Sequence, residues 1–314
     1  MDSDVNAGPG AAPRQHPARL TVGVIGVGRV GSALGVALSR AGHEVVAVSG
    51  VSEASRQRAA DRLPGALVAE PHEVLSRAEL VLLAVPDDAL PGLVAGLAAT
   101  GAELAGRLLV HPSGRYGTSV LAPATRLGAL PLALHPVMTF TGRPDDADRL
   151  DGVSFGVTAP PELRLVAEAL VIEMGGEPVF IAEENRALYH AALASAANHL
   201  VALVAEAADL LRAAGAANPG RMLGPLLSAA LDNALRLGDA GLTGPVARGD
   251  TDTVARHLEV LGAASPQALA AYRELARLTT TRAQAAGLIK PADAQRLYEV
   301  LSETAPDDPQ EPPR

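Results

Sequence analysis

The stretch Leu20-Thr-Val-Gly-Val-Ile-Gly-Val-Gly-Arg-Val-Gly31 decides the fold of this 314-residue chain. A short β-branched run leads into the pattern G-x-G-x-x-G, and an Ala/Leu-rich helical stretch follows at once. Gly26 suits the tight turn after a strand, Gly28 lets the backbone approach a pyrophosphate, and Gly31 permits close packing of helix on strand. The free N–H groups at the start of the helix favour phosphate. We expect the dinucleotide contacts of this unit to come from Gly26, Val27, Gly28, Arg29, Val30 and Gly31.

Short β-branched runs alternate with Ala/Leu-rich stretches up to residue 181. The expected strands are 20–25, 44–48, 80–85, 107–111, 129–135, 153–158 and 177–181. Such alternation is typical of a mostly parallel sheet covered on both faces. Afterwards only helices are expected, over 183–214, 219–238, 250–261, 265–286 and 291–303. The predicted architecture is α/β, with a Rossmann-type sheet domain over residues 19–182 and an all-helical C-terminal domain over 183–303.

Composition narrows the possible functions. The net charge of −9 argues against binding to nucleic acid or to an anionic membrane. Because the chain has no cysteine, disulfides, thiolate nucleophiles and Cys-ligated zinc are excluded, and no metal site is predicted. Residues 1–18 and 304–314 are polar and are predicted to be disordered tails, and the first lacks the apolar run of a secretory signal. We therefore expect a cytoplasmic protein.

The end of the second strand indicates which dinucleotide binds. An NAD enzyme usually places Asp or Glu there to bind the ribose 2′-hydroxyl. This chain has Ser49 instead, and Ser52, Ser55, Arg56 and Arg58 follow. Hydroxyls and a guanidinium accept the 2′-phosphate that a carboxylate would repel. We expect NADP(H), with Ser49 and Arg56 as the best candidates; the alternative is that the two arginines only solvate the next helix.

Three of the expected strands end in residues suited to a site. One runs into Val85 and Pro86, the next into His111-Pro-Ser113, and the third into His135 and a proline. Ligands of parallel sheets bind beyond the carboxyl ends of the strands. We expect Val85 and Pro86 to contact the cofactor, and Ser113 and His135 to line the substrate pocket. The alternative is that the His-Pro pairs only terminate strands.

The first helix of the second domain is apolar almost all round, so we expect it to be central and buried. His190, Ala194 and Asn198 follow each other at steps of four and share one face. Buried His and Asn side chains need partners, which a substrate, a cofactor carboxamide or another helix would supply. Further on, Thr243 and Arg248 flank a compact turn. They are candidates to grip a substrate carboxylate, or the turn only caps the next helix.

These segments resemble the 6-phosphogluconate and β-hydroxyacid dehydrogenase-like superfamily over nearly all of residues 20–300. More narrowly, HPVMTF (135–140), YHAALASAANHLVAL (189–203) and LTGPVARGD (242–250) resemble a bacterial family that pairs a Rossmann-like domain with a C-terminal helical domain of unknown function. Ketopantoate reductases show Lys, Asn and Asn at steps of four, and the phrase from Asn198 to Leu203 is similar to the one that begins at their last Asn. The resemblance places His190 at the lysine and Ala194 at the middle Asn.

The resemblance implies an NADPH-dependent oxidoreductase that reduces the carbonyl of a small 2-oxo acid, with ketopantoate as the most specific candidate. His190 would replace the missing lysine as proton donor, Asn198 would orient the substrate, and Thr243 and Arg248 would hold its carboxylate. The alternatives are an imine reductase of the pyrroline-carboxylate type and a non-catalytic NADP-binding regulatory protein. The resemblance also implies a homodimer formed through the helical domains.

Overall fold

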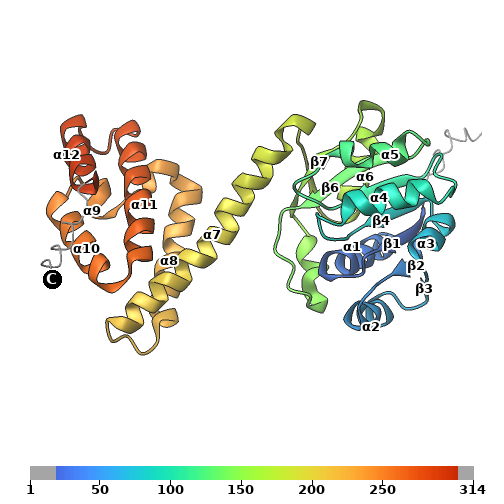
Figure 1. Cartoon of the computed structure of the whole chain (residues 1–314), viewed down its shortest axis with the longest axis horizontal. Helices are drawn as coiled ribbons and strands as arrows, with labels where there is room; N and C mark the ends of the chain where they lie inside the picture. Colours follow the sequence, from blue (N-terminus) through green and yellow to red (C-terminus); the bar gives the residue numbers. More distant parts are fainter. Residues whose placement is uncertain (1–18, 303–314) are drawn as a thin grey trace, which may run out of the picture. The chain divides into compact units, whose positions relative to one another are not determined.

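The computed structural model describes residues 19–302, and within that range eight strands form one sheet (Figure 1). The strands are β1 (Thr21–Ile25), β2 (Glu44–Ser49), β3 (Leu67–Val68), β4 (Leu80–Leu83), β5 (Leu108–His111), β6 (Leu130–Pro136), β7 (Ser154–Thr158) and β8 (Glu177–Phe180). Their order is β3-β2-β1-β4-β5-β6-β7-β8, and every neighbouring pair is parallel except β6 and β7. The predicted mostly parallel sheet is confirmed, whereas the two tails predicted from the sequence lie outside the described residues.

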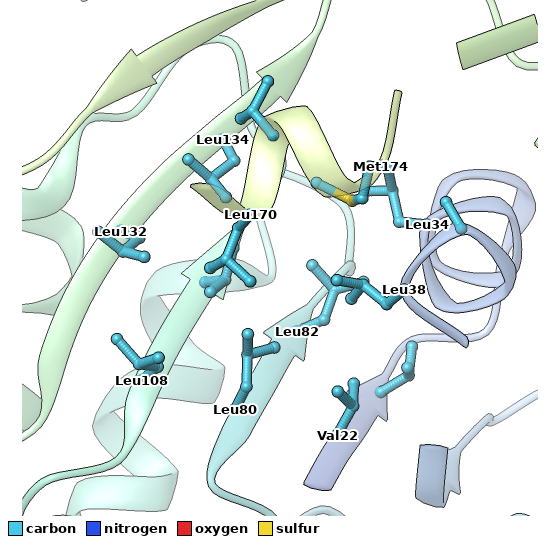
Figure 2. Packing of buried hydrophobic residues seen from close by; sticks show 14 of the residues in the cluster. Val22, Leu34, Leu38, Leu80, Leu82, Leu108, Leu132, Leu134, Leu170 and Met174 are labelled. Carbon is cyan, nitrogen blue, oxygen red and sulfur yellow. The ribbon is translucent and has the colours of Figure 1, made fainter. Parts of the chain in front are cut away.

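Helices cover both faces of the sheet. They are α1 (Arg29–Arg40), α2 (Glu53–Arg62), α3 (Pro71–Arg77), α4 (Leu90–Ala99), α5 (Ala122–Thr125) and α6 (Arg164–Glu173). Side chains of β4 alternate between two cores: Leu80 and Leu82 pack with α1 and α6, and Val81 and Leu83 pack with α3 and α4. Figure 2 shows the first core, in which leucines of the strands meet α1 and α6. Burial on both faces explains the continuous apolar strands.

The second part of the chain is helical. Its helices are α7 (Arg186–Ala213), α8 (Pro219–Leu237), α9 (Gly244–Ala247), α10 (Thr251–Ala264), α11 (Pro266–Ala285) and α12 (Pro291–Ser302). The chain also contains the 3-10 turns η1 (Thr118–Leu121), η2 (Pro144–Asp146), η3 (Asp148–Leu150), η4 (Pro161–Leu163), η5 (Glu183–Asn185) and η6 (Gly238–Gly241). The chain divides into two compact units between Ser195 and Ala196, inside α7, whereas the sequence places the boundary before residue 183. We call them the sheet unit and the helical unit.

The expectation that α7 is central and buried is wrong for a single copy of this chain. Of the residues of α7, all of which the structure describes, only Arg186 is buried. Val201 is 71% exposed, and Leu226 and Leu235 of α8 are 65% and 80% exposed. The reason is that residues of α9 to α12 close the core of the helical unit by themselves. An apolar cavity of about 450 Å³ remains between α7, α10 and α11.

The exposed apolar helix has two physical explanations. Among the described residues, Glu183–Ala213 is the one segment long and apolar enough to cross a membrane, with a mean hydropathy of 1.4. However, His190, Asn198 and His199 interrupt it, and Arg186 near its start is buried in the sheet unit. A bilayer disfavours such polar groups, whereas a protein surface can bond them. These features favour a protein partner.

We propose that a second copy of the chain covers α7 and α8. In a twofold pair, the same apolar stripe covers its counterpart, so one surface serves both partners. Leu235→Glu should place a carboxylate in this interface and convert a dimer into a monomer, as measured by light scattering at micromolar concentration. Leu165→Glu on α6 is the matched control, because Leu165 is also 80% exposed. A monomer mass for the unaltered protein would contradict the proposal.

Candidate active site

The glycine turn between β1 and α1 has the close contacts of a dinucleotide site. Gly26 has φ 97°, and a Cβ there would lie 2.4 Å from the carbonyl oxygen of Ala84. A Cβ on Gly31 would lie 2.1 Å from the carbonyl oxygen of Gly26. At Gly28, by contrast, a Cβ would meet no atom within 4 Å. Since α1 has no side-chain cap and no acidic residue in its first turn, its positive end and this open space fit a pyrophosphate.

The other residues predicted around this turn fall into two groups. Val27 is fully buried, so only its backbone can contact a ligand, whereas Val30 is half-buried and packs against the sheet core. Arg29 is exposed on the first turn of α1. Val85 and Pro86 follow β4 at the same carboxyl edge, where Val85 is half-buried and Pro86 exposed. The structure therefore brings this predicted set together at one edge.

The end of β2 gives the two arginines different surroundings. Arg56 donates to the Glu53 carboxylate at 2.7 Å and to the Val51 carbonyl at 2.8 Å, and its side chain is 46% exposed. Arg58 is half-buried and reaches back to the glycine turn, where its Nε donates to the carbonyl of Val27 at 3.4 Å. Its Nη2 donates to the Ser55 hydroxyl at 3.4 Å. Arg58, which the sequence ranked below Arg56, is therefore the guanidinium beside the turn.

Two further features frame the glycine turn. Ser49 is buried at the end of β2, and its carbonyl accepts a hydrogen bond from the N–H of Gly26 at 2.9 Å. On the other side, Arg62 donates to the carbonyl of Gly142 and, at 3.2 Å, to the hydroxyl of Ser32 on α1. The loop that contains Gly142 thus lies against α1. Sequence reasoning missed this contact, because no local pattern marks it.

The end of β5 is fixed by a buried histidine. His111 is fully buried, and its Nε2 donates to the carbonyl of Gly117 at 2.8 Å while its Nδ1 accepts from the N–H of Ser113 at 3.3 Å. Burial lowers the pKa of His111 from 6.5 to about 4, so the ring is neutral at pH 7. The Ser113 hydroxyl accepts from the N–H groups of Arg115 and Tyr116. These bonds hold the loop, so both side chains have a structural role.

The end of β6 meets the start of α7. The Nδ1 atom of His135 and the hydroxyl of Tyr189 form a hydrogen bond of 2.7 Å, with the rings edge to face. Burial, and then the positive charge of Arg186, lower the pKa of His135 to about 4. His190 lies beside His135. A Cβ on Gly114 would lie 3.0 Å from Cδ2 of His190 and 2.9 Å from Nε2 of His135. His135 and His190 therefore flank Gly114 at the carboxyl edge of the sheet, and Tyr189 is hydrogen-bonded to His135.

Arg186 lies beneath this group and is 2% exposed. Its Nε donates to the Thr158 hydroxyl at 2.7 Å, and its Nη2 donates to the carbonyls of Gly156 at 3.0 Å and Ala133 at 3.2 Å. Its guanidinium carbon also lies 5.6 Å from the centre of the Tyr189 ring. Sequence reasoning missed Arg186, since an arginine at the start of a helix normally indicates a solvated side chain.

Three predicted residues belong to the helical unit. Asn198 is exposed on α7, and Thr243 and Arg248 are exposed at the two ends of α9. Asp250 caps α10 by accepting from the N–H of Thr253 at 3.1 Å. Within the sheet unit, the structure brings together Ser113, His135 and His190, and it adds Tyr189 and Arg186 to them.

Comparison with known proteins identifies two family segments in the chain. Residues 6–136 match the family of the Rossmann-like domain, and residues 153–279 match the domain of unknown function DUF2520. The predicted pairing of a Rossmann-like domain with a C-terminal domain of unknown function is thereby confirmed. The DUF2520 segment begins at β7, so it supplies Gly156, Arg186 and Tyr189 to the sheet unit. No curated protein matches the chain.

Solved structures of low sequence identity share the fold. BF3122 from Bacteroides fragilis, a candidate NADP oxidoreductase, is 24% identical over 83% of this chain and 98% of its own, with a TM-score of 0.68. An imine reductase from Pseudomonas sp. is 22% identical over 90% of this chain and 100% of its own, with a TM-score of 0.60. Pyrroline carboxylate reductase from Plasmodium falciparum with NADP bound is 12% identical over 90% and 98%, with a TM-score of 0.55.

The neutral state of His111 predicts an acid-sensitive sheet unit. Between pH 6.5 and 4 the unfolded chain binds a proton at this histidine that the folded chain excludes, so stability falls as the pH falls. From pH 7 to pH 5 the loss attributable to His111 should be about 2 kcal/mol. His111→Asn should reduce the loss by that amount in urea unfolding, whereas His72→Asn, at an exposed histidine on α3, should leave it unchanged.

The same prediction has a test that requires no variant. Titration of the histidine signals by nuclear magnetic resonance should show that the rings of His111 and His135 stay neutral until about pH 4. A His111 signal that titrates near its ordinary value of 6.5 would contradict the burial argument.

Proposed function

We propose that the protein is an NADPH-dependent oxidoreductase that reduces a C=O or C=N bond of a small substrate. One observation carries the proposal: His135 and His190 flank Gly114, and Tyr189 is hydrogen-bonded to His135, at the same carboxyl edge of the sheet as the open glycine turn. In open parallel sheets, this edge holds cofactor and substrate. The bound cofactor would supply a hydride, and the imidazole and phenol groups are suited to move the accompanying proton.

The substrate class depends on whether a cation is available for a carboxylate. Arg186 of the sheet unit already donates to Thr158, Gly156 and Ala133. A 2-oxo acid such as ketopantoate needs a cation that protein acceptors leave open, so Arg186 is not suited to hold its carboxylate. A cyclic imine without a carboxylate has no such need. The occupied guanidinium favours the imine as a second candidate, and imine reduction is also the activity named for the Pseudomonas protein of similar fold.

A screen of substrates tests the proposed reaction. NADPH oxidation should be followed spectroscopically with 2-oxo acids, including ketopantoate, and with cyclic imines, including pyrroline carboxylate. We expect turnover with at least one of these classes. Gly28→Val should abolish it by filling the open space, whereas Gly92→Val on α4, where a Cβ also meets no atom within 4 Å, is the matched control. Tight NADPH binding without turnover on any compound would indicate the regulatory alternative instead.

We also propose that Arg58, with Ser55 and Ser52, binds the 2′-phosphate of NADPH. The hydroxyls of Ser52 and Ser55 lie 2.9 Å apart, and Arg58 links Ser55 to the glycine turn. Arg56 is less suited, because its guanidinium is already paired with Glu53. These contacts favour Arg58 over Arg56 for binding the 2′-phosphate, and Ser49 lies buried at the end of β2.

NADPH should therefore bind more tightly than NADH. A charge-assisted contact contributes about 1.5–3 kcal/mol, so Arg58→Ala should weaken NADPH binding about 10- to 100-fold and leave NADH binding nearly unchanged. Arg56→Ala is the matched control and should affect NADPH little. Fluorescence titration measures the affinities of the unaltered protein and of both variants for each cofactor. Equal affinity of the unaltered protein for both cofactors would refute the NADPH assignment, and a selective loss in Arg56→Ala alone would return the role to Arg56.

A further inference from the structure

We propose that Tyr189, rather than His190, donates the proton in this reaction, and that His135 and Arg186 are its positioning residues. The inference rests on the proposed function, because it assigns a step within it. It starts from one contact, the 2.7 Å hydrogen bond between the Tyr189 hydroxyl and Nδ1 of His135. No comparable bond fixes the imidazole of His190 within residues 19–302.

The hydroxyl of Tyr189 occupies a space that the sheet leaves open for it. Gly156 of β7 pairs with His135 of β6 in the antiparallel ladder. A Cβ on Gly156 would lie 2.2 Å from the Tyr189 hydroxyl oxygen, so only glycine permits this position. The phenol is therefore held between a strand backbone and an imidazole. Such fixed geometry is what a proton donor requires, since reacting atoms must already be placed before transfer.

The neutral state of His135 determines what this hydrogen bond can do. A neutral imidazole carries one N–H. If Nδ1 carries it, the ring donates to the phenol oxygen, and the phenol hydrogen stays free to point at the substrate. The groups whose charges act on His135 are Arg186 and His190 on α7, Asp87 after β4, and His111 on β5. Burial has the largest effect and keeps its pKa near 4, so this neutral state persists across the physiological range.

Arg186 supplies the charge that a transient phenolate needs. Burial raises the pKa of Tyr189, and the nearby guanidinium of Arg186 lowers it. The guanidinium is held rigidly by Thr158, Gly156 and Ala133, so its distance to the phenol is fixed. A positive charge fixed at this place stabilises a developing phenolate without reorganisation. Arg186 therefore acts on the donor and does not need to contact the substrate.

With a hydride, and its two electrons, supplied by the bound cofactor, the substrate carbon would gain a C–H bond, and the electron pair of the C=O or C=N bond would move to the oxygen or nitrogen. That atom forms a bond to the Tyr189 hydrogen, and the O–H bond of Tyr189 breaks. The phenolate that remains accepts a hydrogen bond from the N–H of His135 and is stabilised by the positive charge of Arg186. It then regains a proton from water.

Replacement of Tyr189 by Phe is the central test, with the best substrate of the screen. Tyr189→Phe keeps the ring and should lower kcat by about 10²–10⁴-fold, the usual contribution of a general acid, with unchanged NADPH affinity. His190→Gln should lower kcat much less. Tyr298→Phe is the matched control, because it removes a tyrosine hydroxyl bonded to Thr281 in the helical unit. The reverse ranking of Tyr189→Phe and His190→Gln would overturn the assignment.

The pH dependence of kcat separates the two donors. A phenol whose pKa lies above its usual value of 10.0 stays protonated through neutral pH, so kcat should not decline until the medium is strongly alkaline. A histidine donor would have to be an imidazolium, so kcat would decline with rising pH long before a phenol ionises. A decline of kcat around neutral pH that disappears in His190→Gln would overturn the proposal.

A readout without turnover tests the positioning residues. The ultraviolet absorbance of tyrosinate, taken as the difference between the cofactor-free protein and its Tyr189→Phe variant, reports the ionisation of Tyr189. His135→Ala removes the N–H that stabilises the phenolate, so this ionisation should move to higher pH. His135→Asn keeps an N–H, so the pH at which Tyr189 ionises and the value of kcat should both return part of the way to those of the unaltered protein. An unchanged titration in His135→Ala would overturn the role of His135.

The outcomes also distinguish this inference from the proposed function. If the unaltered protein turns over a carbonyl or imine and the Tyr189→Phe variant does so equally well, the proposed function stands and only the role of Tyr189 is overturned. A protein without any turnover overturns both. A folded Tyr189→Phe variant is required, and its thermal unfolding checks that the sheet unit is intact.

Discussion

A single buried guanidinium connects the parts of the candidate site. Arg186 donates to β6 through Ala133, to β7 through Gly156 and Thr158, and to the loop after β5 through Ser113. Burial of a charge costs several kcal/mol unless it is hydrogen-bonded. Hydrogen bonds from the guanidinium to carbonyl and hydroxyl oxygens offset this free energy, and these acceptors are neutral. The positive charge therefore remains uncompensated by these contacts and acts on the His135 and Tyr189 rings beside it.

The candidate site combines segments of two protein families. His135 and the loop at Ser113 belong to the Rossmann-like segment, and Gly156, Arg186 and Tyr189 belong to the DUF2520 segment. The division between compact units, at Ser195, is a different one. Family boundaries and packing boundaries differ here because β7, β8 and the first turns of α7 complete the sheet unit while lying in the second family segment.

The sequence predicts those features that depend on local pattern. The glycine spacing, the alternation of strands and helices, and the polar residues at the strand ends are all local, so they place the glycine turn and His135 at the carboxyl ends of their strands. The position of His190 at the same edge depends on how the start of α7 packs, which no local pattern reveals. The choice between Arg56 and Arg58 depends on side-chain direction and on a competing carboxylate, Glu53, which spacing does not reveal. The burial of Arg186 depends on acceptors up to 73 residues away. The exposure of α7 depends on how the other helices close their core.

The space at Gly156 makes residues 156 and 189 depend on each other, although they are far apart in the sequence. Because the Tyr189 hydroxyl occupies the place of a Cβ, a side chain can enter at residue 156 only when that hydroxyl has gone or moved. A library that varies residue 156 alone would consist mainly of proteins with a displaced phenol, whatever the chemistry of the new side chain. Efforts to change the substrate range of this site would therefore have to vary residues 156 and 189 together.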